Sequence, residues 1–140
     1  MANEKLIVIP TYNEAESITR TVETIFLCGV PSLGILIVDD ESPDGTGSIA
    51  DGLASRYPGQ VTVCHRYGER GLGNAYKAGF LQALAMDAKV IVQMDADGSH
   101  SPEYLPVMFE KIKRFDVVIG SRYTNGGGVD PQWGLGRRVL

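Results

Sequence analysis

The sequence has few of the features that mark disulfide-stabilised, membrane-spanning or nucleic-acid-binding proteins. Among 140 residues it has only two cysteines, Cys28 and Cys64, without metal-ligand spacing, so we expect core thiols in a reducing compartment. No apolar run approaches the roughly 20 residues of a membrane span, and the N-terminus lacks a signal-peptide pattern. The net charge of −4 argues against a nucleic-acid partner, which would favour a basic stripe. A cytosolic enzyme is the default expectation.

What is present is an ordinary globular composition. Hydrophobic residues make up 44% of the chain and charged residues 21%, which excludes a disordered protein. The length suits one domain with a real core. We therefore expect residues 1–140 to form a single domain.

Five short apolar segments rich in β-branched residues are expected to be strands. Their near-continuous hydrophobic runs indicate burial on both faces. They are Lys5–Pro10, Leu33–Asp39, Val61–His65, Lys89–Asp95 and Asp116–Gly120.

Segments with helical spacing alternate with these strands. Asn13 is expected to cap the first helix, with Glu16 in a capping-box position. Further helices are expected over Thr46–Arg56, over about residues 73–86, and from Ser101 onward. The alternation predicts an α/β fold, a mostly parallel sheet flanked by helices with right-handed crossovers. Residues 123–136 are expected to form a loop that leaves the sheet, and we expect the chain to lack its C-terminal part.

The unusual residues follow the expected strands, where an open parallel sheet binds its ligands. Three of the four groups are acidic, and carboxylates that converge on one edge repel unless a cation or hydrogen-bond donors balance them. The groups are Pro10–Glu14, Asp39–Thr46, Asp95–Asp97 and Ser121–Tyr123.

Asp95 and Asp97 are the strongest metal candidates. Two residues apart in an extended segment, their carboxylates would point to the same side. Hard oxygen ligands suit Mg²⁺ or Mn²⁺, whose remaining positions a substrate diphosphate can fill. The alternative is that the two acids only end a strand and precede a helix, since this spacing also recurs by chance.

Asp39 and Asp40 end a run of Ile-Leu-Ile-Val, so one is expected to face a ligand and the other the scaffold. Either could accept a hydrogen bond from a nucleotide base or ribose. The alternative is turn formation, because residues 41–46 are rich in turn formers.

Two other patterns in the sequence bear on phosphate binding. The glycine-rich segment 68–74 lacks the third glycine of a dinucleotide fingerprint and the ending of a P-loop, so its glycines are expected to allow a close approach. Arg122, Arg137 and Arg138 are the notable cations, suited to bidentate phosphate contacts, although surface arginines are common.

Taken together, the motifs resemble the polyprenol-phosphate (dolichol-phosphate) mannosyltransferases, which are inverting family 2 glycosyltransferases of the GT-A, Rossmann-like fold. The Asp-Ala-Asp-Gly-Ser-His form is similar to that of actinobacterial members. The blocks that carry the resemblance are Ile-Pro-Thr-Tyr-Asn-Glu, Val-Asp-Asp-x-Ser-Pro-Asp-Gly-Thr, Gly-Leu-Gly-x-Ala-Tyr, Met-Asp-Ala-Asp-x-Ser-His and Gly-Ser-Arg-Tyr.

The resemblance implies transfer of mannose from GDP-mannose to polyprenyl phosphate, with inversion and a Mg²⁺ or Mn²⁺ cofactor. It implies a catalytic set of Asp97, Arg122 and Arg137, the two arginines binding the acceptor phosphate. It implies that Asp95 and Asp97 bind the metal. It implies nucleotide-sugar contacts from Pro10, Tyr12, Glu14, Asp39, Asp40, Asp95 and Ala96.

Two departures from the family pattern limit the metal site. Gly98 stands where many relatives carry leucine, and Ser99 where some offer a longer side chain, so Ser99 is only a weak third ligand. The lipid acceptor implies work at the cytoplasmic face of a membrane, through surface association or an anchoring partner or domain outside this chain.

A phosphate acceptor removes the need for a general base. Its second pKa is near 6, so it is already anionic at neutral pH. Three alternatives remain: a family 2 enzyme that uses another donor such as UDP-glucose or a hydroxyl acceptor, a non-catalytic nucleotide-sugar-binding fragment, and a nucleotidyltransferase. A hydroxyl acceptor would need a catalytic carboxylate, for which Asp116 and Asp130 are weak candidates. A nucleotidyltransferase would need a glycine-rich basic loop after the first strand, and residues 10–14 lack one.

Overall fold

The structure is a computed structural model that describes residues 3–128. The chain divides into two compact units, Met1–Glu103 and Tyr104–Leu140. The first unit contains the sheet and three helices, and the second contains one short helix among its described residues.

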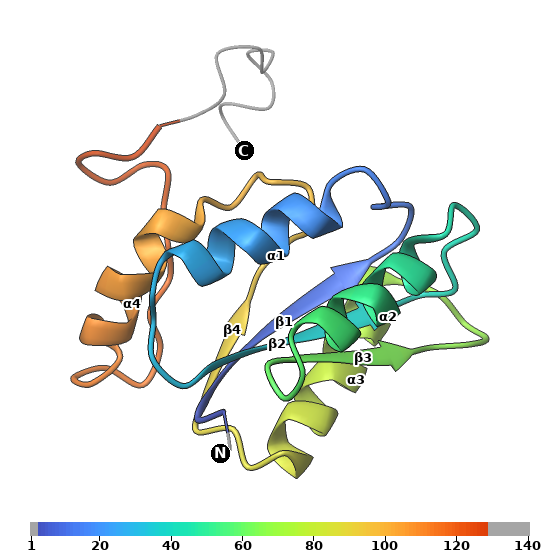
Figure 1. Cartoon of the computed structure of the whole chain (residues 1–140). Coiled ribbons are helices and arrows are strands. Elements are labelled where there is room, and N and C mark those ends of the chain that lie inside the picture. Colours follow the sequence, from blue (N-terminus) through green and yellow to red (C-terminus); the bar gives the residue numbers. More distant parts are fainter. Residues whose placement is uncertain (1–2, 129–140) are drawn as a thin grey trace. The chain divides into compact units, whose positions relative to one another are not determined.

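Four of the five expected strands form one parallel sheet in the order β3-β2-β1-β4 (Figure 1). Lys5 of β1 lies opposite Leu33 of β2 on one side and Val90 of β4 on the other. The observed bounds lie within two residues of the expected ones: β1 Lys5–Thr11, β2 Leu33–Asp39, β3 Val61–His65 and β4 Val90–Gln93.

The direction in which strands are added to the sheet reverses at β1. The chain builds β1, β2 and β3 toward one edge, and β4 then pairs with the other side of β1. Helices α1 (Ile18–Leu27) and α2 (Thr46–Arg56) cover one face of the sheet, and α3 (Leu72–Ala85) covers the opposite face (Figure 1). In open α/β sheets such a reversal leaves a crevice at the carboxyl ends of the strands, here between β1 and β4.

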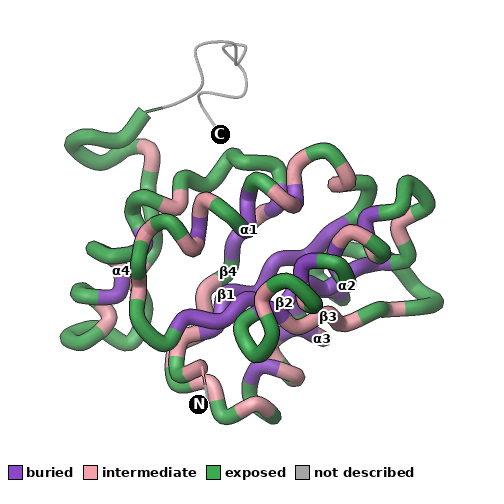
Figure 2. The backbone as a smooth tube through the Cα atoms, in the orientation of Figure 1, coloured by how far each residue is buried: buried purple, intermediate pink, exposed green. Residues whose placement is uncertain are grey.

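The core of this unit lies around the two central strands (Figure 2). Residues 33–39 of β2 are all buried, as are residues 6–11 of β1. The edge strands β3 and β4 are only partly buried, so the expectation of burial on both faces holds for the centre of the sheet and was wrong for its edges.

Helix α3 packs very close to the sheet. Its residues Ala75, Tyr76 and Ala83 form one core cluster with Leu6, Val8, Leu36 and Val38. A Cβ atom added to Gly79 would lie 2.4 Å from Val8 Cγ1, so a glycine is needed at this point of contact.

Helix α1 begins later than its sequence suggested. Ser17 is the residue before its first turn, whereas Asn13 adopts a positive φ of 57° in the preceding loop. The Asn13 N–H is bonded to the Ser42 hydroxyl, so Asn13 belongs to the loop and the expected capping box was wrong. Helix α2 has the expected bounds.

The expected fourth helix is present in two pieces, of which only the second lies entirely in the second unit. A 3-10 turn, η1 (Pro102–Tyr104), precedes α4 (Leu105–Lys111), and Leu105 and Phe109 are buried. The expected strand at residues 116–120 was wrong, because Val117 and Ile119 are 72% and 81% exposed and no described strand pairs with them. Apolar β-branched composition alone does not supply the main-chain partners that a strand requires.

Within residues 3–128, none of the helices has both the length and the apolar character needed to cross a membrane.

Candidate functional site

The loop after β4 presents Asp95 and Asp97 on one side. Met94 and Ala96 are buried while Asp95 and Asp97 are not, and this alternation is that of an extended segment. Hydrogen bonds to β1 and to α1 hold this loop in place. The Met94 N–H donates to the Val8 carbonyl at 3.2 Å, and the buried Thr21 hydroxyl of α1 donates to the Ala96 carbonyl at 2.8 Å.

Asp95 is held between two aromatic side chains. Its Oδ1 accepts a hydrogen bond of 2.8 Å from the Tyr76 hydroxyl, and its Oδ2 lies 3.7 Å from His100 Nε2. The Asp95 N–H donates to His100 Nδ1 at 3.1 Å. Because Nδ1 accepts this bond, the imidazole carries its proton on Nε2, which faces the carboxylate.

The protonation states of this region follow from its contacts. Burial, followed by the hydrogen bond to Asp95, raises the pKa of the Tyr76 phenol far above its usual range. Hydrogen bonds from Ser99, whose N–H donates to Asp97 Oδ1 at 2.9 Å, lower the pKa of Asp97. At neutral pH, Tyr76 is therefore a neutral hydrogen-bond donor and Asp97 a carboxylate.

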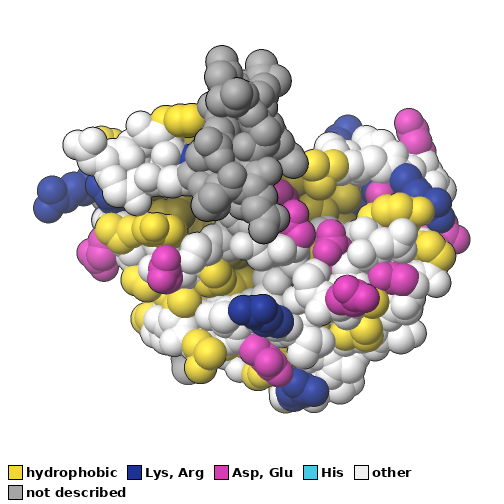
Figure 3. Space-filling model, turned by 90° about the horizontal axis from the view of Figure 1, so that it is seen from above, with side chains coloured by type: hydrophobic (Ala, Val, Ile, Leu, Met, Phe, Trp, Pro, Cys, Tyr) yellow, Lys and Arg dark blue, Asp and Glu magenta, His cyan; other side chains and the backbone are white. Residues whose placement is uncertain are grey.

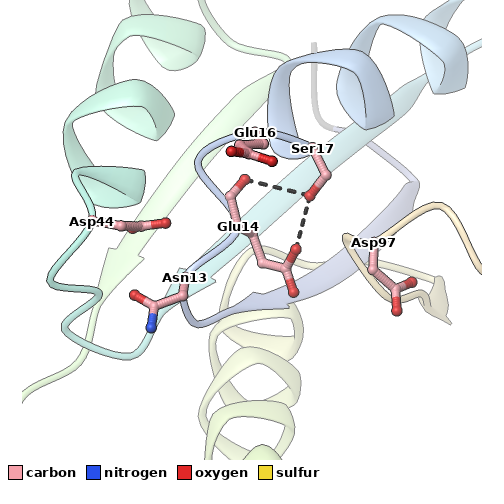
Figure 4. Close-up of a pocket in the computed structure, with 6 residues that line it drawn as sticks. All are labelled: Asn13, Glu14, Glu16, Ser17, Asp44 and Asp97. Carbon is pink, nitrogen blue, oxygen red and sulfur yellow. Dashed lines mark hydrogen bonds between the residues drawn. The ribbon is translucent and has the colours of Figure 1, made fainter.

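Asp97 also lines a pocket of about 300 Å³ with the loop that follows β1 (Figure 4). Figure 4 shows Asp97 and Asp44 on different loops, with Glu14 between them. The Glu14 carboxylate accepts a hydrogen bond of 2.8 Å from the Ser17 hydroxyl. The lining is strongly acidic and polar: Asn13, Glu14, Glu16, Ser17, Asp44 and Asp97.

Acidic side chains also gather in the middle of the face drawn in Figure 3. Four acidic residues, Glu14, Glu16, Asp44 and Asp97, line the pocket, and like charges that share one site repel one another. A cation would therefore be attracted to this region of the first unit.

The loop after β1 is held by the loop after β2 through three consecutive main-chain amides. The N–H groups of Asn13, Glu14 and Ala15 donate to Ser42 Oγ, Thr46 Oγ1 and Asp44 Oδ2 at 3.0, 3.0 and 3.1 Å. The Ser-Pro-Asp-Gly-Thr block of the sequence thus sets the position of the adjacent loop. We name residues 42–46 the amide clamp.

Asp39 and Asp40 have different surroundings, as the alternation of a strand predicts. Asp39 Oδ1 accepts hydrogen bonds from the hydroxyls of Thr11 and Ser42, and Oδ2 accepts one from the Ser42 N–H. Asp40 forms an ion pair with Arg66, and its Oδ2 accepts the Gly71 N–H at 2.9 Å. Asp39 therefore joins the ends of β1 and β2, and Asp40 joins the end of β2 to the 66–71 loop.

Tyr12 and Pro10 lie at the end of β1. The guanidinium of Arg70 lies 5.1 Å from the centroid of the exposed Tyr12 ring, and its Nη1 donates to the Tyr12 hydroxyl at 3.3 Å. Pro10 is buried opposite Val38.

Eight expected site residues belong to the first unit: Pro10, Tyr12, Glu14, Asp39, Asp40, Asp95, Ala96 and Asp97. Arg122 belongs to the second unit, and Arg137 lies outside the described residues. Ser99 contributes its N–H to Asp97. Within residues 3–128, no three His, Cys, Asp or Glu side chains are grouped so as to hold a metal.

The sequence interpretation missed Arg66, Arg70 and Tyr76. Arg66 directly follows β3, so the strand-end rule that selected the acidic groups would have found it. Tyr76 lies in the helix expected over about residues 73–86 and is buried, and a buried tyrosine hydroxyl needs a polar partner. The sequence could therefore have indicated that the Tyr76 hydroxyl has a polar partner, but it could not have identified that partner as Asp95.

Comparisons with known proteins agree on one family. A sequence model described as Glycosyl transferase family 2 matches residues 6–138. The chain is 47% identical over 135 residues to the undecaprenyl-phosphate mannosyltransferase of Micrococcus luteus, covering 96% of this chain and 54% of that protein. It is 47% identical over 136 residues to the polyprenol monophosphomannose synthase of Mycolicibacterium smegmatis, covering 96% and 51%.

The solved structure of a mannosyltransferase from Pyrobaculum calidifontis in complex with GDP-Man and Mn²⁺ is among those similar to this chain. The TM-score is 0.61 at 29% sequence identity, over 67% of this chain and 27% of that one. The present chain spans about half the length of the two curated relatives.

Proposed function

Since the chain belongs to glycosyl transferase family 2 and has the GT-A fold expected from its sequence, we propose that its protein transfers mannose from GDP-mannose to a polyprenyl phosphate. One observation carries the proposal: Asp97 lines a pocket with Glu14 at the crevice between β1 and β4. The names of the relatives favour a polyprenyl phosphate acceptor over a sugar hydroxyl. Residues 1–140 would act as one nucleotide-sugar-binding and catalytic domain.

Asp95 and Asp97 would hold a divalent cation, Mg²⁺ or Mn²⁺. Each has one carboxylate oxygen engaged, Asp95 Oδ1 by Tyr76 and Asp97 Oδ1 by Ser99, so each can offer its Oδ2. Two hard oxygen ligands fit a cation that is shared with substrate phosphates. When bound, the cation would stabilise the negative charge of the departing GDP.

The donor nucleotide would lie along the ends of β1 and β2. The Tyr12 ring offers an exposed face, and Glu14 offers a carboxylate in the pocket. Asp40 would contact the nucleotide together with its partner Arg66, while Asp39 would act mainly through the Thr11 and Ser42 contacts that shape this edge. Pro10 and Ala96, both buried, can contribute main-chain atoms.

The acceptor phosphate would be bound by Arg122 and Arg137. A phosphate monoester is largely dianionic near pH 7, so it can attack without a general base. The arginines would balance its charge and hold it in line with the departing diphosphate. With a lipid acceptor, the reaction would take place at a membrane surface, which we propose is the cytoplasmic face, through surface association or an anchoring partner or domain outside this chain.

The test uses the full-length protein with radiolabelled GDP-mannose and a short polyprenyl phosphate, with and without Mn²⁺ or Mg²⁺. We expect butanol-extractable mannolipid only when metal is present. UDP-glucose in a parallel reaction tests the donor, and a free sugar alcohol tests the acceptor. An absence of mannolipid under all metal conditions contradicts the proposal, and nucleotide binding without turnover would point to a binding fragment.

A further inference from the structure

Tyr76 connects the hydrophobic core to the carboxylate of Asp95. The residue lies in the second turn of α3, on the face of the sheet opposite α1 and α2. Its hydroxyl donates to Asp95 Oδ1 at 2.8 Å. A helix that covers the sheet therefore contributes one polar atom to the edge where Asp95 and Asp97 lie.

The Tyr76 ring has little freedom to move. The residue is only 6% exposed and belongs to the core cluster that includes Val8 and Val38. Phe80 lies one helical turn further along, with ring centroids 5.9 Å apart. Since side chains in such cores stay in one rotamer, the position of the hydroxyl is fixed by packing.

The hydrogen bond leaves the two oxygens of Asp95 unequal. Oδ1 accepts the hydrogen bond of the Tyr76 hydroxyl, whereas Oδ2 lies on the side of His100, at 3.7 Å from Nε2. The His100 ring is itself positioned by the Asp95 N–H. The carboxylate is therefore held through Oδ1, and only Oδ2 can bind a new ligand without loss of the Tyr76 contact.

We propose that Tyr76 is a positioning residue that restricts Asp95 to one-oxygen binding of the divalent cation. The inference rests on the proposed function, in which Asp95 is a metal ligand. In this arrangement Tyr76 acts on the cation through its hydrogen bond to Asp95. Partners that orient metal ligands are typically worth about 10–100-fold in metal affinity.

The experiment compares wild type with Tyr76→Phe in the full-length protein. GDP binding is titrated against Mn²⁺ by calorimetry, and mannosyl transfer is measured across the same Mn²⁺ range. For Tyr76→Phe we expect the Mn²⁺ concentration at half-saturation to rise about 10–100-fold, with a much smaller change in rate at saturating Mn²⁺. Tyr57→Phe, which removes a hydroxyl from the ring packed on Phe26, is the matched control and should leave both quantities unchanged.

A double-mutant cycle separates positioning from general stability. In an Asp95→Ala background, Tyr76→Phe should change the Mn²⁺ requirement no further, because the partner through which it acts is gone. Equal effects of Tyr76→Phe in both backgrounds would overturn the inference, as would an unchanged Mn²⁺ requirement in the single variant.

Two further measurements keep the outcome interpretable. The metal-free melting temperature shows whether Tyr76→Phe is folded, and 4-fluorophenylalanine at position 76 keeps the volume while removing the donor, so it should behave as Tyr76→Phe does. A wild type whose GDP binding needs no metal would overturn the proposed function and this inference together. Metal-dependent binding in wild type with no response to either substitution would overturn only the inference.

Discussion

Asp44 shows how one carboxylate can tie two loops together. Its Oδ2 accepts the Ala15 N–H, and its Oδ1 accepts both the N–H and the hydroxyl of Thr46. The Thr46 hydroxyl is the main cause of a lowered Asp44 pKa in the folded protein. The contacts of the amide clamp with Ala15 and Thr46 therefore depend on the negative charge of Asp44.

We predict an acid-dependent contribution of Asp44 to stability. Because its pKa is lower in the folded than in the unfolded state, the unfolded chain takes up the proton first as pH falls. The contribution is present above the unfolded pKa of about 4 and is lost as pH falls below it. Urea unfolding should show that wild type has a larger free energy of unfolding than Asp44→Asn at pH 7, and that this difference becomes smaller toward pH 3.

Thr46→Ser, which keeps the hydroxyl, is the matched control and should retain the wild-type dependence on pH. If the difference in the free energy of unfolding between wild type and Asp44→Asn stays constant from pH 7 to pH 3, the prediction is contradicted.

A second prediction about a single residue concerns the role of Asp97 in metal-dependent binding of GDP. In wild type, GDP with Mn²⁺ should raise the melting temperature, since a ligand at 100 times its Kd stabilises by about 2.7 kcal/mol. That corresponds to roughly 5–10 °C for a domain of this size. The rise should vanish with a chelator and in Asp97→Ala, and it should persist in Asp116→Ala, a control in the second unit. An undiminished rise in Asp97→Ala would refute the metal role.

Single residues were predictable where a general rule fixed their place. Asp95 and Asp97 follow a strand of a parallel sheet, so their location at the carboxyl end of that strand and their common side followed from strand geometry. The partners Tyr76 and Arg66 come from elements distant in sequence, and their contacts with Asp95 and Asp40 depend on how the elements pack. Periodicity along the chain carries no information on such contacts.

At the scale of elements, two glycines in helices offer a matched pair. A Cβ at Gly79 of α3 would meet Val8 and Val38, whereas a Cβ at Gly52 of α2 would meet nothing within 4 Å. We predict that Gly79→Ala destabilises by about 1–3 kcal/mol through overpacking. Gly52→Ala should stabilise by about 0.5–1 kcal/mol, because alanine is the better helix former.

Denaturant unfolding of both variants measures these changes directly. Gly79→Ala as stable as wild type would mean that α3 can move away from the sheet, contrary to the close packing described above. Gly52→Ala controls for helix propensity, since both substitutions add the same methyl group to a helix.

Elements were predicted well where local pattern and tertiary environment agree. β2 and α2 were placed with their observed bounds, because their apolar runs and turn residues change sharply at both ends. The start of α1 was misplaced because Ser42, distant in sequence, binds the Asn13 N–H. Residues 116–120 have strand composition without a described strand partner, which composition could not reveal.

At the scale of the molecule, regular structure is concentrated in the first unit. Residues 112–128 contain no helix or strand, while Arg56 ends α2 and Arg66 is ion-paired with Asp40. We predict that trypsin first cleaves after Arg114 or Arg122 in the 140-residue chain, because proteolysis requires locally opened backbone. Mass spectrometry of early fragments measures this order, and a first cut after Arg56 or Arg66 would contradict it.

The order of strands in the sheet has a consequence for synthesis on the ribosome. β1 emerges first, yet its second neighbour is β4, and the pair Glu4–Lys89 at that edge spans 85 residues of chain. Until β4 emerges, one apolar edge of the nascent sheet stays open, even after β2 and β3 have assembled. Closing so long a loop is entropically slow, and such open edges expose a growing chain to misassembly. The strand that brings Asp95 and Asp97 to the crevice is thus also the one that closes the sheet.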